Sequence, residues 1–355
     1  MLPSAEAWRF YAIDRYCEFA ERWDRLNAAS AGPPFLSSMF IRHLLNVFSS
    51  GSERVVALGR RGEERALGIV CPLRTGTWTT FQPSQLPLGA WVMESSLDYT
   101  QVANSLLRAL PGLPLLLSLT QQDPVVRPRP EHSNTLRTVD YIQTGWVDVE
   151  GTFDSYWKAR GKHLQQNMRT QRSKLRNQGI ETSLDVLTRP EQVRSAIADY
   201  GRLESAGWKG SAGTAVGEDN AQGRFYRAML EDFCRADAAR IYRYRFGERV
   251  VAVDLCIESP TVQVPLKTTY DETMKGLSPS SLLRQEAYRH VFEDGRVRRI
   301  EFYGRVVEWT ARWTELKRTL YHVNAWRWGI VPAAVTQVSR LRSALVSVGV
   351  GAARV

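Results

Sequence analysis

The feature of this chain that most constrains its fold is an order of elements that occurs twice. In the C-terminal half, β-branched and aromatic runs indicate strands, and Gly247 and Pro260 mark the turns between them. Apolar residues at helical spacing precede the last run. This half therefore predicts three strands, a helix and a further strand, at residues 239–247, 250–257, 262–270, 280–293 and 299–303.

The N-terminal half shows the same order. Its three strands, helix and final strand are expected at residues 54–58, 66–73, 78–81, 102–110 and 113–119. In both halves the third strand leads into a helix, and such a βα step favours a mixed sheet with helices packed on it. We therefore expect an internal duplication, although many α/β domains share so short a pattern.

Residues 121–130, between the halves, hold three prolines and predict an irregular connection. We place the domain limits at 1–150, 151–329 and 330–355, with one long helix over 152–177 leading into the second lobe. The last segment is apolar but is interrupted by polar and basic residues, so it predicts a packed or amphipathic helical tail.

No apolar run reaches the roughly 18–20 residues that cross a bilayer, and the N-terminus lacks the pattern of a signal peptide. These features predict a cytoplasmic protein, with peripheral membrane contact by the tail as an alternative. Cys17, Cys71, Cys234 and Cys256 lie far apart and the five histidines do not cluster. We therefore expect reduced thiols and no metal site.

The expected helix over 152–177 is the most basic segment, with no acid between residues 155 and 180. An apolar stripe at helical spacing predicts a packed face, made up of Trp157, Leu164, Met168 and Leu175. The opposite face either is simply solvated or faces an anion, and the lack of acids favours the second reading. Together with the net charge of +10, this basic face predicts attraction to an anionic partner. The candidates are CoA phosphates, a nucleotide-sugar, an acidic carrier protein, RNA and an anionic membrane. The cations are Lys158, Arg160, Lys162, Arg169, Arg172, Lys174 and Arg176.

Several motifs follow one another in a fixed order along most of the chain. The most specific is Lys267-x-x-Tyr270-Asp271, seven residues before a Ser-Pro and Leu-Leu run. The ordered set is Pro34-Phe35-Leu36-Ser37-Ser38, Arg169-x-x-Arg172-x-Lys174-Leu175-x-x-x-Gly179, Glu204-Ser205-x-Gly207-Trp208-Lys209-Gly210, Lys267-x-x-Tyr270-Asp271, Ser278-Pro279-Ser280-Ser281-Leu282-Leu283, and Phe302-Tyr303-Gly304 with Trp313 downstream. With this set the chain resembles the CelD/BcsL-type branch of the GNAT acyltransferases, whose relatives include the two-lobed Fem-type peptidyl ligases.

The resemblance implies an α/β (α+β) protein of two tandem GNAT-like lobes, each a mixed, mostly antiparallel sheet flanked by helices. It implies an acyl-CoA site in the C-terminal lobe. The N-terminal lobe lacks a second Lys-x-x-Tyr-Asp set, so we expect it to shape the acceptor cleft without binding CoA. Where relatives tend to have an aspartate beside the aromatic of the last motif, this chain has Glu301-Phe302-Tyr303.

GNAT enzymes hold the CoA pyrophosphate on backbone N–H groups where a loop enters a helix, since a helix N-terminus offers unpaired donors and partial positive charge. The resemblance places this site between the third strand and the helix of the second lobe. The alternative for the same residues is an ordinary Ser-Pro helix cap. The implied CoA-binding residues are Gly276, Ser278, Pro279, Ser280, Ser281 and Leu282.

Acyl transfer from a thioester to an amine needs a base for the amine, a donor for the thioester oxygen and an acid for the thiolate. Glu204, Asp254 and Asp271 are the candidate bases. Each has a plainer alternative: Glu204 as a surface charge, Asp254 facing solvent, and Asp271 capping the turn at 271–276. The candidate acids are Tyr270 and Tyr303, and Lys267 is a candidate for binding phosphate or stabilising the developing charge.

The acceptor amine is expected to contact Trp208, Lys209, Tyr303, Trp313, Arg169 and Arg172. For the first two, the alternative is a core anchor beside a surface cation. The G-x-S-x-G and P-loop motifs are absent from the sequence, so we do not favour a covalent acyl-enzyme.

Three functions fit these features. The first is an N-acyltransferase that uses acetyl-CoA or a longer acyl-CoA on a small amine, and the resemblance implies an amino sugar in polysaccharide or envelope assembly. An acyl carrier protein as donor is its variant. The second is a Fem-like transferase that uses aminoacyl-tRNA, which the lack of dense aromatic interleaving in the basic helix makes the weaker reading. The third is a non-catalytic module of two degenerate lobes.

Overall fold

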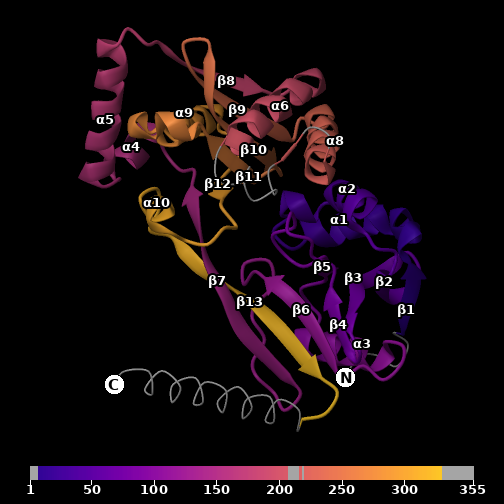
Figure 1. Ribbon diagram of the computed structural model, residues 1–355. Coiled ribbons are helices and arrows are strands. Elements are labelled where there is room, and N and C mark those ends of the chain that lie inside the picture. The colour runs from indigo at the N-terminus through magenta and orange to yellow at the C-terminus, as the bar shows by residue number, and fades with distance from the viewer. Residues whose placement is uncertain (1–6, 207–215, 218–219, 330–355) are drawn as a thin grey trace, which may run out of the picture. The chain divides into compact units, whose positions relative to one another are not determined.

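The computed structural model describes residues 7–206, 216–217 and 220–329, which form two compact units (Figure 1). Within the described residues, unit 1 comprises 7–31, 50–141 and 319–329. Unit 2 comprises 32–49 and the described part of 142–318. The expected helical tail, 330–355, lies outside the described residues, and the predicted domain limits stay a prediction.

The sheet of unit 1 has one parallel strand pair among antiparallel ones. Its strand order is β1-β2-β3-β4-β6-β13, with β5 beside β3. The crossover between the parallel strands β4 and β6 contains helix α3 (Tyr99–Ala109), whose apolar residues pack on the sheet. The strands are β1 (Trp8–Ala12), β2 (Arg54–Arg60), β3 (Glu63–Arg74), β4 (Thr77–Thr80), β5 (Trp91–Met93), β6 (Leu116–Gln122) and β13 (Lys317–Trp326), and helix α1 (Ala20–Ala28) precedes β2.

The sheet of unit 2 repeats this plan with the order β8-β9-β10-β11-β12-β7. Only its β11–β12 pair is parallel, and helix α9 (Pro279–Asp294) lies in the crossover between these two strands. The strands are β7 (Leu136–Asp148), β8 (Thr182–Leu187), β9 (Ala239–Phe246), β10 (Arg249–Glu258), β11 (Val262–Tyr270) and β12 (Arg299–Glu301).

Helices cover both faces of the unit 2 sheet. One core joins α4 (Phe153–Lys158), α5 (Lys162–Asn177) and α9 to inward residues of β9 and β10, such as Tyr242 and Ala252. Helices α6 (Pro190–Ala206) and α8 (Ala221–Arg235) pack against β10 and β9, and α2 (Ser38–Phe48) packs against α8 through Phe40 and Phe225. The mixed, mostly antiparallel sheets flanked by helices confirm the expected fold class.

The last strand of each sheet is the strand that follows the crossover helix of the other unit in the chain. In unit 1, β6 pairs with β13, which follows the unit 2 crossover in the chain. In unit 2, β12 pairs with β7, which follows the unit 1 crossover. The terminal strands are therefore exchanged between the two copies of the plan.

The predicted helix over 152–177 is wrong as a single element. The structure has two helices there, α4 and α5, because Gly161 has an extended ψ of 138° at the start of α5. The Gln165 side chain donates to the carbonyl of Arg160, and the Arg160 guanidinium donates to the carbonyl of Trp313. These bonds hold the turn between the helices.

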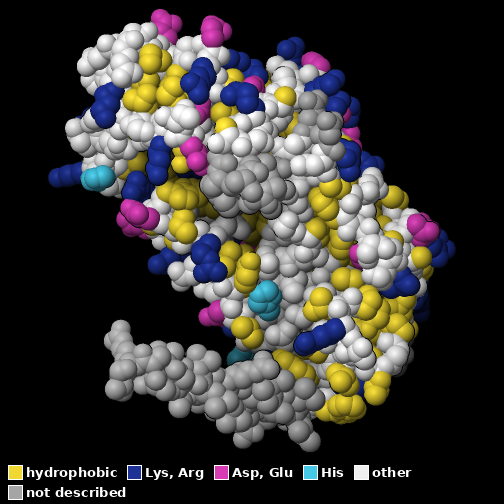
Figure 2. Space-filling model, in the orientation of Figure 1, with side chains coloured by type: hydrophobic (Ala, Val, Ile, Leu, Met, Phe, Trp, Pro, Cys, Tyr) yellow, Lys and Arg dark blue, Asp and Glu magenta, His cyan; other side chains and the backbone are white. Residues whose placement is uncertain are grey.

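Among the described residues, no helix combines the length and apolar composition needed to cross a membrane. Lys and Arg side chains are spread over the face shown in Figure 2.

Candidate functional site

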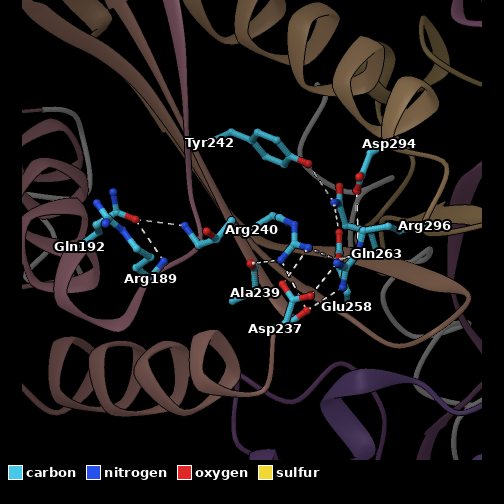
Figure 3. Close-up of polar contacts among 11 residues, drawn as sticks. Arg189, Gln192, Asp237, Ala239, Arg240, Tyr242, Glu258, Gln263, Asp294 and Arg296 are labelled. Atoms are coloured by element: carbon cyan, nitrogen blue, oxygen red, sulfur yellow. Dashed lines mark hydrogen bonds and ion pairs between the residues drawn. The ribbon is translucent and has the colours of Figure 1, made fainter.

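A buried network of polar side chains stabilises one end of the unit 2 sheet, where β10 turns into β11 (Figure 3). Gln263 is 2% exposed, and its side-chain amide donates to Glu258 Oε1 at 2.7 Å and to the Tyr242 hydroxyl at 3.0 Å. Arg240, which is 5% exposed, lies 3.8 Å from Glu258 Oε2. Buried polar groups stabilise a fold only when they are paired in this way, so this end is structural.

At the other end of the same strands, β11 and β12 separate. They pair only at Val262↔Arg299 and Gln263↔Ile300, after which β12 continues along β7, with the Phe302 amide donating to Gly145 O at 3.1 Å. β11 stays with β10 but carries a bulge, because Leu255 pairs with Lys267 and Cys256 with Pro265. A bulge bends a strand and re-aims its side chains. The remaining length of β11 therefore has an edge that is not paired to β12.

Asp254 lies on β10, the other neighbour of β11, where it pairs with Thr268 on the face of the sheet that α9 covers. It is 4% exposed, so the structure excludes the reading in which it faces solvent. Burial raises the pKa of its carboxyl group, although the charge of Arg284 and a hydrogen bond with Thr268 oppose the rise. Among the described residues, Asp254 Oδ1 has no hydrogen-bond partner. Such a group marks a functional candidate, since most buried polar atoms are paired.

Glu204 lies on the opposite face of the sheet, in the last turn of α6. It is 4% exposed and is not the surface charge of the plainer reading. Its carboxylate accepts a hydrogen bond from the Val216 amide at 2.7 Å and one from the Tyr200 hydroxyl at 3.2 Å. Burial and the neighbouring Glu204 raise the pKa of Tyr200, which keeps that hydroxyl protonated as a donor.

Thr268, two residues after the bulge of β11, connects the two faces. Its side chain bonds Asp254, and its carbonyl accepts from the Tyr200 hydroxyl at 3.4 Å. The adjacent Lys267 places its ammonium 5.7 Å from the ring centre of Tyr226, a buried α8 residue whose pKa is raised by burial and by Glu204. The structure thus brings Glu204, Asp254 and Lys267 together around one stretch of β11.

The chain then passes through Tyr270 into the turn η3 (Glu272–Leu277). Tyr270 is half-buried against the α9-side core. Asp271 accepts from the Thr273 amide at 3.0 Å and pairs with Arg249 at 2.5 Å, so it does cap this turn. Burial disfavours its charged form, but the bonds from Thr273 and Arg249 outweigh burial and lower its pKa.

The expected CoA-binding residues form the entry to α9. Gly276 is exposed, and a Cβ added there would meet nothing within 4 Å. Ser278 is left-handed, with φ 52°, and its side chain makes no capping hydrogen bond. Pro279 and Leu282 are buried and fix the helix on the core, whereas Ser278, Ser280 and Ser281 are partly exposed. Gly276 and the three serines are therefore the parts of the predicted loop that a ligand can reach.

The expected acceptor residues lie in other surroundings. Tyr303 packs edge-on to Phe35 with ring centres 4.7 Å apart. Trp313 is 1% exposed in the core, Arg169 is exposed on α5, and Arg172 bonds Gln285 and Glu286 of α9. Trp208 and Lys209 lie outside the described residues.

The sequence reading missed three side chains of this region. Tyr200 lies one turn before Glu204 on α6, a spacing that could have indicated the pair. Arg284 is 6% exposed on α9 and stacks on Trp309 at 4.4 Å. Tyr288, one turn further on α9, is buried, and its hydroxyl has no partner among the described residues. Nothing in the pattern of α9 distinguishes Arg284 from the helix's exposed cations.

Comparison with protein families gives this region a reaction class. Residues 162–311, from α5 through α10 (Glu308–Ala311), match the model of an acetyltransferase (GNAT) domain. The matched stretch contains Glu204, Asp254, Lys267 and the entry to α9. The chain thus carries a GNAT-type acetyltransferase domain and is an enzyme of the acyltransferase class. The narrower resemblance to the CelD/BcsL branch stays a prediction.

Solved structures share the fold along nearly the whole chain. The C-terminal domain (DUF2156) of a putative lysylphosphatidylglycerol synthetase from Agrobacterium fabrum has a TM-score of 0.56 at 12% identity, covering 92% of this chain and 96% of its own. A conserved protein of unknown function from Bacteroides thetaiotaomicron has a TM-score of 0.55 at 11% identity, covering 90% and 100%. FemX has a TM-score of 0.53 at 8% identity, covering 90% and 98%. No curated protein sequence matches this chain.

Proposed function

We propose that this enzyme is an acyl-CoA-dependent N-acyltransferase whose donor binds between the edge of β11 and the entry to α9. The observation that carries the proposal is the separation of β11 from β12 beyond Gln263, beside a helix entry that has no side-chain cap. An extended pantetheine arm can use the backbone groups of an open strand edge. A diphosphate is suited to the first turn of a helix, where N–H groups and the helix dipole converge.

Glu204 is the proposed general base. Its buried carboxylate is held by Val216 and Tyr200, and Lys267 lies in the same cluster near Tyr226. In the reaction the acceptor amine gives its proton to Glu204 and its nitrogen bonds the acyl carbon. The carbon–sulfur bond then breaks, and the thiolate takes a proton from the Tyr270 hydroxyl. Lys267 stabilises the charge that develops on the thioester oxygen.

The acceptor is proposed to be a small molecule with a primary amine. The narrower proposal, an amino sugar used in polysaccharide or envelope assembly, rests on the resemblance to the CelD/BcsL branch. Asp254 is proposed to position β11, the strand along which the donor binds. It lies on the α9 side of the sheet, where it bonds Thr268 of that strand.

Isothermal titration with CoA and acetyl-CoA tests the donor site. We expect the protein to bind both with a Kd between about 1 μM and 1 mM, the usual range for enzyme substrates. The variant Ser281→Asp places a carboxylate in the first turn of α9, where it repels a diphosphate but is compatible with the helix dipole. We expect it to weaken binding by about tenfold.

The matched control is Ser281→Asn, which has nearly the same shape and no charge. It should bind within about threefold of the unmodified protein, because the first-turn N–H groups remain. A folded protein that binds neither CoA nor acetyl-CoA contradicts the proposal. So does equal binding by the Asp and Asn variants.

A further inference from the structure

Helix α5 presents a basic face that the proposed chemistry does not use. Leu164, Met168 and Leu175 pack into the unit 2 core, so the opposite side of the helix faces outward. Figure 2 shows Lys and Arg side chains along the edge where Figure 1 places α5. A hollow of about 530 Å³ lies on this side, lined by Gln166, Arg169, Thr170, Ser173, Lys174, Arg176 and Asn177.

The cations of this face are available for a partner. Arg169, Lys174 and Arg176 are exposed and form no ion pair with any described residue. Arg172 differs, because it is paired with Glu286 and so attaches α5 to α9. Since α5 itself carries no acid, the outward face has a uniform positive charge.

The position of the face connects it with the donor site. Helix α5 lies beside η3, the turn that leads into the first turn of α9. The Arg172–Gln285 bond, at 3.0 Å, joins α5 to α9 less than two turns beyond Ser281. A partner seated on α5 is therefore next to the entry through which a donor reaches α9.

We propose that the basic face of α5 docks an acidic carrier protein, which delivers the acyl group on its own phosphopantetheine arm. The inference rests on the proposed function, because the arm carries the same thioester and a phosphate for the same helix entry. The uncharged residues Gln166, Thr170, Ser173 and Asn177 recur every three or four residues, so they form one stripe along α5 and line the hollow. By the same helical spacing, Arg169 and Arg176 flank this stripe on one side and Lys174 on the other.

This arrangement suits an acidic helix better than RNA. Two helices approach to about 8–10 Å where the side chains between them are short, and flanking cations can then meet carboxylates at the rim. Single-stranded RNA is held largely by stacking on aromatic rings, and the hollow is lined by no aromatic residue among those described.

The test measures the affinity of the full chain for acetyl-CoA, acetylated acyl carrier protein and bulk tRNA. The variant Arg169→Glu/Arg176→Glu reverses two cations of the face. The control Arg60→Glu/Arg108→Glu reverses two exposed cations of unit 1 and changes the net charge equally. We expect the first variant to bind the carrier protein about tenfold more weakly and the control to differ by less than about threefold.

The affinity for acetyl-CoA distinguishes a failure of the docking inference from a failure of the proposed function. It should bind all three proteins equally, because the α5 cations lie outside the first turn of α9. If acetyl-CoA binds but the carrier protein does not, or if both double variants weaken the carrier protein equally, the docking inference is overturned and the proposed function stands. If acetyl-CoA does not bind, the proposed function fails instead. Binding of tRNA that is tighter than that of the carrier protein and lost in Arg169→Glu/Arg176→Glu assigns the face to RNA and overturns the inference.

Discussion

The two units place a crossover helix between parallel strands in the same way, but they finish those strands differently. In unit 1, the β4–β6 pairing continues into a bond between the Thr80 and Thr120 hydroxyls at 2.6 Å. The Thr120 amide donates to Thr80 Oγ1 at 3.0 Å, and the Gly89 amide donates to Thr120 O at 3.1 Å. In unit 2, β11 and β12 part after two residue pairs.

The helix entries differ in the same sense. Asp98 caps α3 of unit 1, with its carboxylate accepting from the Gln101 amide at 2.7 Å. Ser278 provides no such bond at the entry to α9. In unit 1, the Asp98 carboxylate caps the helix entry and the threonine bonds join the strand ends. In unit 2, the helix entry and the strand edge are both left for a ligand. One architecture has become a structural lobe in one copy and a candidate active site in the other.

The prediction with the largest expected effect tests whether unit 2 catalyses acyl transfer. Glu204→Gln keeps an acceptor for the Val216 amide but removes the base, so we expect the rate of acyl transfer to fall by about 100- to 10,000-fold. The measurement is the release of CoA from acetyl-CoA with a panel of primary amines, and acetyl-CoA affinity should not change. An unchanged rate would separate Glu204 from the reaction.

The closed end of unit 1 is tested by Gly89→Ala. A Cβ at this position would lie 2.6 Å from both Thr120 O and Thr80 Oγ1, so the strands must shift to accommodate it. We expect a loss of about 1–3 kcal/mol in the free energy of unfolding, measured by urea titration. Gly276→Ala, at the open end of unit 2, should change it by less than about 0.5 kcal/mol because nothing lies within 4 Å. Equal effects at the two glycines would remove the contrast between the ends.

The two helix entries can be compared through their caps. Asp98→Ala removes the bond to the Gln101 amide and should lower the free energy of unfolding by about 0.5–2 kcal/mol. Ser278→Ala should have a smaller effect, since the Ser278 side chain makes no capping bond. Thermal melts of the two variants and the unmodified protein measure the difference. A larger loss for Ser278→Ala would mean that the α9 entry has an internal cap after all.

The smallest expected effect has the opposite sign and depends on pH. The middle of β10 contains buried Asp254, where the matching stretch of β3, Ala66–Val70, is apolar. Since burial raises the pKa of Asp254, the folded state loses stability as the pH rises from the carboxyl's unfolded pKa toward its folded one. Asp254→Asn should therefore stabilise the protein more at pH 8 than at pH 4, as measured by thermal melts at both values. A pH-independent change would show that burial of the charged Asp254 carboxylate does not destabilise the folded state.

The order of elements could be predicted because each depends on local residues. Strand β11 was predicted with its observed bounds, and α9 within one residue at each end, since Ser278-Pro279 and Gly295 mark its limits. Lys267 and Tyr270 could be assigned to the strand that opens. The bulge at Leu266 could not, because it exists only in the pairing with β10.

Long-range contacts set the limit of the sequence reading. Strands β7 and β13 were not predicted, because their partners, β12 and β6, lie far along the chain. The burial of Asp254 and Arg284 was missed for a similar reason, since one polar residue in a strand or helix does not reveal which side faces the core. Both are visible only once α9 is placed on the sheet.

The exchanged strands have a consequence for how the chain is made. A ribosome that has released everything up to β7 has not yet produced β13, the neighbour that completes the sheet beside β6. Until then, the nascent N-terminal lobe carries an unsatisfied strand edge, which is a site for mispairing with other chains. Expression of that lobe alone should therefore give aggregates, and a circular permutant that begins with β13 should allow the first lobe to mature early.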